Sequence, residues 1–204
     1  MIYSITEGNF ISTKASRERL TKALDDLDKY LSVYFKYLDS LSKNTKQLLD
    51  AINNHKLDKF NDLKKELDQI SKEFVNNSDP EAKSIQAFGS LLRKNIRDIR
   101  HSESRDRIDT ELSKFIDKDG EYVKHITKLS KEFANYAEDM QITKMLTSDK
   151  DKNTMEEMKD FANKNIALGY KTLQQLINFI GRCGIHMQSI KAKSKSFFEQ
   201  INFV

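Results

Sequence analysis

The side chains able to do catalytic chemistry are few in this sequence. Its one cysteine, Cys183, and its histidines, His55, His101, His125 and His186, are the candidate nucleophiles and metal ligands. The histidines match neither the HExxH pattern nor any Cys/His spacing of a zinc site. Cys183 falls on a helical apolar stripe, where a buried structural thiol is expected rather than a nucleophile. We therefore expect no enzymatic activity, no cofactor and no metal.

Charge offers a different chemistry, because basic side chains can hold an anionic surface. The 204 residues include 35 Lys and Arg and 31 Asp and Glu, a balance too even to indicate a nucleic-acid-binding protein. No apolar run approaches the roughly 20 residues that span a bilayer, and the opening "MIYSITEGNF" lacks the pattern of a signal peptide. A single cysteine agrees with a reducing compartment. These features predict a cytoplasmic protein.

The elements that position the charges are predicted to be helices, because only 6 Gly and 1 Pro occur. Apolar residues recur every 3.5 residues from Leu20 to Ile52 and again from Leu57 to Phe74, the spacing of supercoiled helices. The interruption at Asn53–His55 predicts a kink or short break within one long helix. Asp79 and Pro80 then form the start signal of the next helix.

The second helix is predicted to run from residue 80 to about 146, roughly 100 Å at 1.5 Å per residue. Its middle, "RKNIRDIRHSESRDR" from Arg93 to Arg107, is highly charged but contains no Gly or Pro, so we expect no loop there. Gly120 predicts a second kink. A third helix begins near the capping-box pair Thr154 and Glu157 and extends to the C-terminal residues.

The fold class is therefore all-α, with three long, kinked, antiparallel helices forming a coiled-coil bundle over residues 13–204, preceded by a segment of residues 1–12. Additional apolar residues widen the helical stripes beyond what three thin helices can cover, which favours an elongated homodimer. These residues are Phe35, Leu49, Leu91, Ile116, Val123, Phe161, Ile177 and Phe179. Gly169, Gly181 and Gly184 in the third helix indicate close helix approach or bending.

Two segments resemble the BAR domain, a crescent-shaped dimer that binds and bends membranes. "SIQAFGSLLRKNIRDIR" (84–100) is similar to the start of the second helix in that family, and "RDRIDTELSKFIDKDGEYVKHITKLSKEFANYAEDM" (105–140) is similar to the segment that follows in BAR domains found beside lipid-binding or GTPase-activating domains. The resemblance implies a non-enzymatic, peripheral membrane protein that senses or generates curvature. Residues 1–12 lack the basic amphipathic character of a membrane-inserting helix.

The resemblance also implies where the membrane is met. Basic residues at the tips of the crescent and along its concave face would contact anionic phospholipid, each contributing about 1 kcal/mol. The alternative is that these residues are solvated helix faces, and that the arginine group pairs with Asp98 and Glu103. The residues concerned are Lys144, Lys150 and Lys152 at the tip, Lys124, Lys128 and Lys131 on the second helix, and Arg93, Lys94, Arg97 and Arg100 nearer the dimer centre.

Two other classes of function fit the same composition. A cytosolic helical scaffold could bind a protein partner such as a small GTPase without lipid. A helical bacterial effector or toxin subunit is suggested by the Lys- and Asn-rich sequence that lacks Trp. A scaffold would need an exposed apolar or acidic patch, and a pore-forming subunit would need an apolar hairpin, which the sequence does not show.

Overall fold

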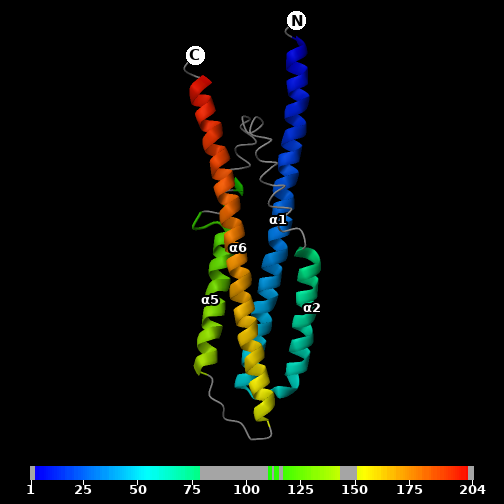
Figure 1. Cartoon of the computed structure of the whole chain (residues 1–204), viewed down its shortest axis with the longest axis vertical. Coiled ribbons are helices and arrows are strands. Elements are labelled where there is room, and N and C mark those ends of the chain that lie inside the picture. Colours follow the sequence, from blue (N-terminus) through cyan, green and yellow to red (C-terminus); the bar gives the residue numbers. More distant parts are fainter. Residues whose placement is uncertain (1–2, 79–109, 112, 115–116, 143–150, 202–204) are drawn as a thin grey trace. The chain divides into compact units, whose positions relative to one another are not determined.

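A computed structural model describes residues 3–78, 110–111, 113–114, 117–142 and 151–201 of the chain. Within these ranges the chain is almost entirely helical and contains no strand, which confirms the all-α class. The main helices are α1 (Tyr3–Asn53), α2 (Phe60–Ser78), α5 (Glu121–Ile142) and α6 (Lys152–Ile201), shown in Figure 1. None of the helices in the described ranges is both long enough and apolar enough to span a bilayer.

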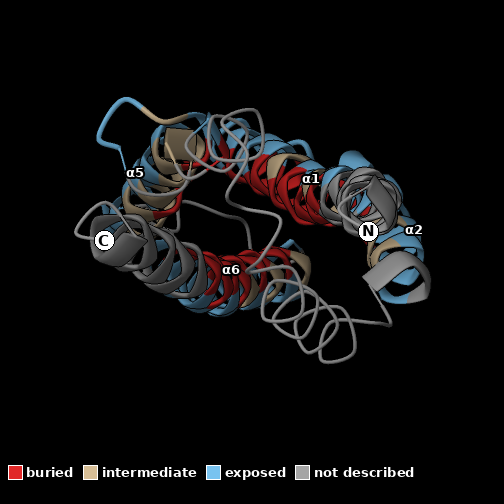
Figure 2. Cartoon of the chain, turned by 90° about the horizontal axis from the view of Figure 1, so that it is seen from above, coloured by how far each residue is buried: buried red, intermediate tan, exposed pale blue. Residues whose placement is uncertain are grey.

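The chain divides into two compact units, and the divisions fall within α1, α5 and α6 and just after α2. Unit 1 comprises residues 1–31, 80–123 and 179–204, and unit 2 comprises residues 32–79 and 124–178. Buried residues occupy one side of α1 and of α6, and exposed residues occupy the other side (Figure 2). This one-sided burial is what the apolar spacing of the sequence predicts.

In unit 2 the interruption at Asn53–His55 is a hairpin turn, so the predicted kink within one helix is wrong. His55 has a φ of 53°, in the left-handed region that ends a helix, and a short 3-10 turn, η1 (Leu57–Lys59), precedes α2. α2 then runs back along α1. Asn44 Nδ2 donates to the Leu63 carbonyl (3.0 Å), and the Tyr37 ring stacks on Phe74 with centroids 4.1 Å apart.

Unit 2 is thus a bundle of four helical segments rather than part of a three-helix rod. Along α1, His125 contacts Phe35 and Glu132 contacts Ser42, so α5 runs parallel to α1. The α6 segment runs antiparallel to α1. Asn165 is paired with Asn44, whereas Met155, earlier in α6, shares a core cluster with Ile52, later in α1. Its core includes Leu48, Leu49, Ala51, Ile52, Phe60, Leu63, Met155, Met158 and Ala162.

In unit 1 the prediction of one continuous second helix is wrong. Residues Asp117–Gly120 form a turn between the helical residues 110–111 and 113–114 and the start of α5, so the helix predicted from 80 to about 146 is not continuous. Gly120 donates its N–H to the Asp117 carbonyl (2.8 Å), and a Cβ at Gly120 would overlap the Ser113 carbonyl oxygen. The expected kink at this glycine is a full interruption. Residues 80–109, including the charged middle of that helix, lie outside the described residues.

Burial within one chain removes part of the argument for a homodimer. Phe35, Leu49 and Phe179, three of the residues thought to need a second copy, are 6%, 4% and 2% exposed in the single chain. Phe161 and Val123 are half-buried, Ile177 is 40% exposed, and Leu91 and Ile116 lie outside the described residues. Leu49 belongs to a core cluster with Phe60 and Leu63, so α2 supplies cover that the three-helix interpretation lacked at this position.

Candidate anionic-surface site

Three lysines of α5 form an exposed line, which we call the α5 lysine stripe: Lys124, Lys128 and Lys131. Their spacing of four and three places them on one side of the helix. Leu129 and Phe133, on the opposite side, are fully buried. Lys128 Nζ lies 3.8 Å from Oε1 of Glu132, one helical turn further along α5.

Polar contacts with α1 fix the rotation of α5 that turns the stripe outward. His125 Nε2–H donates to Asp39 (2.9 Å), and the imidazole stacks on Phe35 with centroids 4.3 Å apart. About two turns further along α5, Glu132 accepts a hydrogen bond from Ser42 Oγ (2.7 Å). The Tyr136 hydroxyl lies 3.0 Å from Ser42 Oγ. Rotating α5 would break these bonds and expose its apolar side.

The remaining predicted membrane residues are only partly described. Lys152 is the first residue of α6 and is exposed, as expected for a residue beside a turn. Its two partners in the predicted tip, Lys144 and Lys150, lie outside the described residues. So does the arginine-rich group of Arg93, Lys94, Arg97 and Arg100.

A larger charge asymmetry on α6 was missed by the sequence interpretation. Between Asp160 and Glu199 the sequence has no acidic residue, although about six would be expected in 38 residues at the chain's own frequency. The same segment carries six cationic residues: Lys164, Lys171, Arg182, Lys191, Lys193 and Lys195. The acid-free run can be read from the sequence alone.

A second charged cluster, in unit 1, is structural. Glu111 has a side chain only 4% exposed and accepts an ion pair from Lys114 Nζ (3.0 Å), which also binds Asp28 (3.1 Å). Burial lowers the pKa of Lys114, but hydrogen bonds to these two carboxylates outweigh it and raise the pKa above its ordinary value. The Tyr122 hydroxyl donates to Asp28 as well. Burial, followed by this carboxylate, raises the pKa of Tyr122. The cluster ties residues 111–122 to α1.

Cys183, the candidate nucleophile of the sequence, is a buried free thiol. Cys183 is 1% exposed, and burial raises the pKa of its thiol to about 12, so the nucleophilic thiolate is not populated near neutral pH. Within the described residues, no three His, Cys, Asp or Glu side chains are grouped to hold a metal ion.

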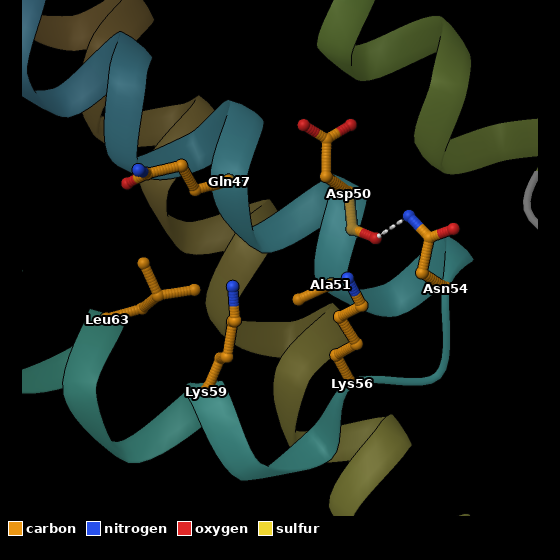
Figure 3. A pocket seen from close by; sticks show the side chains of 7 residues that line it. All are labelled: Gln47, Asp50, Ala51, Asn54, Lys56, Lys59 and Leu63. Carbon is orange, nitrogen blue, oxygen red and sulfur yellow. Dashed lines mark hydrogen bonds between the residues drawn. The ribbon is translucent and has the colours of Figure 1, made fainter.

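A shallow pocket of about 180 Å³ lies at the α1–α2 turn (Figure 3). Lys56 and Lys59 point from the turn toward the end of α1, and the Lys56 N–H donates to the Ala51 carbonyl (2.9 Å). Asn54 Nδ2 donates to the backbone carbonyl of Asp50 (2.7 Å). Cations and donors at a helix C-terminus compensate its partial negative charge. The pocket is therefore explained by the capping of α1.

Comparisons with models of protein families, with curated proteins and with solved structures found no match.

Proposed function

We propose that this chain is a non-enzymatic, peripheral module that binds anionic membrane surfaces through the α5 lysine stripe. The observation that carries the proposal is the exposure of Lys124, Lys128 and Lys131 along one line of a helix whose other side is buried. A line of cations on a rigid helix can approach a flat sheet of phosphate groups together. The resemblance to BAR domains extends the proposal to a homodimer that senses or generates curvature.

The expected affinity of one stripe is low. Three lysines at about 1 kcal/mol each contribute roughly 3 kcal/mol, which alone corresponds to millimolar binding or weaker. Useful binding therefore requires further contacts, either from a second copy of the chain or from another face of the same chain. The electrostatic part must also weaken as salt rises, because exposed charges are screened over about 8 Å at physiological ionic strength.

Sedimentation with vesicles tests the proposal. The chain is expected to sediment with vesicles that contain phosphatidylserine, less with pure phosphatidylcholine vesicles, and less again at high salt. The triple variant K124E/K128E/K131E should lose this binding while retaining its helicity, because surface substitutions usually change stability by less than about 0.5 kcal/mol.

The matched control is K36E/K43E/K46E, which reverses three exposed charges on α1 of the same unit. It should retain most of the binding. Equal, salt-insensitive sedimentation with both vesicle types would contradict the proposal, as would equal loss of binding in the two triple variants.

A further inference from the structure

After Asp160, the outward side of α6 in unit 2 carries cations and exposed apolar groups but no acidic residue. We call this surface the α6 face. After Asp160 its exposed positions are Asn163, Lys164, Ala167, Tyr170, Lys171, Gln174, Gln175, Ile177 and Asn178. An ordinary solvated helix face mixes charges of both signs, as α2 does with Asp62, Lys64, Lys65 and Asp68.

Two large apolar side chains of the α6 face are exposed. Tyr170 is 43% exposed and Ile177 is 40% exposed, and they lie seven residues apart on the same side of the helix. Lys164 and Lys171 form a parallel line beside them, also seven residues apart. A tyrosine with an apolar ring and a polar hydroxyl is a side chain favoured at the membrane interface.

Packing against α5 places Tyr170 on the bundle. Phe133 of α5 is fully buried, and its ring lies against Gly169 and 6.3 Å from the Tyr170 ring, measured between centroids. α6, which carries the α6 face, therefore packs next to α5, which carries the α5 lysine stripe.

We infer that the α6 face is a membrane-contacting surface, with Lys164 and Lys171 binding anionic headgroups and with Tyr170 and Ile177 entering the interfacial layer. This inference rests on the proposed function and adds a shallow apolar contact to it. The occupant is an anionic bilayer because two zones of its surface match the two lines of side chains. Negative headgroups suit the lysines, and the less polar zone beneath the headgroups suits the tyrosine and isoleucine.

The absence of Trp from the chain makes a direct test available. In the variant Ile177→Trp, the only indole lies on the α6 face, and its fluorescence should shift to shorter wavelength with phosphatidylserine vesicles and be quenched by brominated lipid. The control is Val75→Trp, at a position 65% exposed on α2 of the same unit, where neither change is expected. Identical responses from the two variants would overturn the inference.

Charge reversal separates this inference from the proposed function. K164E/K171E should weaken binding to phosphatidylserine vesicles at least tenfold, compared with K43E/K46E, which reverses two exposed charges on α1. If the parent chain binds anionic vesicles and K164E/K171E binds equally well, the α6 inference fails alone. If the parent does not bind them, the proposed function fails too. Competition by single-stranded RNA without any Trp shift would reassign the face to nucleic acid.

Discussion

Burial changes the thiol pKa of Cys183 more than the nearby charge of Arg182 does. The raised thiol pKa, about 12 against an ordinary 9.0, comes first from burial, and the nearby Arg182 opposes the rise only in part. The thiol should therefore resist Ellman's reagent at pH 8 in the native protein and react fully in denaturant. Rapid reaction of the native protein at a rate independent of unfolding would contradict the buried placement.

The same shift has a pH consequence with a definite sign. Because the folded chain favours the neutral thiol, the stabilisation from its burial is fully present below about pH 9 and is lost as pH rises toward 12. Replacement of Cys183 by Ala should therefore flatten the decline in melting temperature across this alkaline range. It should also lower the melting temperature at pH 7, because the removed sulfur leaves a small cavity.

At the scale of elements, two glycines of α6 that look alike in sequence have opposite surroundings. A Cβ at Gly169 would overlap the ring of Phe133, which is fully buried, whereas a Cβ at Gly181 would meet nothing within 4 Å. Gly169→Ala should destabilise the protein by about 1–3 kcal/mol through overpacking. Gly181→Ala should stabilise it by up to about 1 kcal/mol, because alanine favours the helix.

Denaturant unfolding of the two variants measures both changes. If both substitutions stabilised the chain equally, the close approach of α5 to Gly169 would be disproved. The sequence alone predicted only that these glycines permit close approach or bending. It could not separate them, because the partner residue, Phe133, lies 36 positions away in the sequence.

The hairpin between α1 and α2 shows why the number of helices was mispredicted. Apolar spacing is the same whether a helix continues past Asn53 or folds back, since both arrangements bury the same side of each segment. The deciding detail is local: His55 takes a positive φ, which sequence spacing does not reveal. At Gly120 the spacing again continued across a turn. Helix content was predictable and both interruptions were marked as a kink or break, but the reversal after Asn53 and the full interruption at Gly120 were not.

At the scale of the whole molecule, the homodimer remains a prediction. It would double the α5 lysine stripes available to one membrane and raise the weak affinity expected of a single stripe. Light scattering at micromolar concentration should then return twice the mass of the chain. A mass equal to that of one chain would remove the dimer and leave membrane binding to the faces of α5 and α6 in a single copy.

The candidate site was partly predictable at this scale. The exposure of the α5 lysines followed from their position opposite Leu129 and Phe133, residues that the apolar spacing already marked as buried. The acid-free segment of α6 was also present in the sequence. What the sequence could not show is that Tyr170 and Ile177 stay exposed, because their spacing equally suits a buried position and only the packed bundle distinguishes the two.

The α1–α2 hairpin also has a consequence for the order of assembly during synthesis. Its contact between Asn44 and Leu63 closes a loop of 19 residues, whereas the contact between Asn44 and Asn165 closes one of 121. Loop-closure entropy makes the shorter contact cheaper by about 1.6 kcal/mol. Both helices of the hairpin, α1 and α2, are also synthesised before any residue of α5. The nascent chain can thus hold a prefolded surface, lined by Leu48 and Ile52, onto which the two later helices dock.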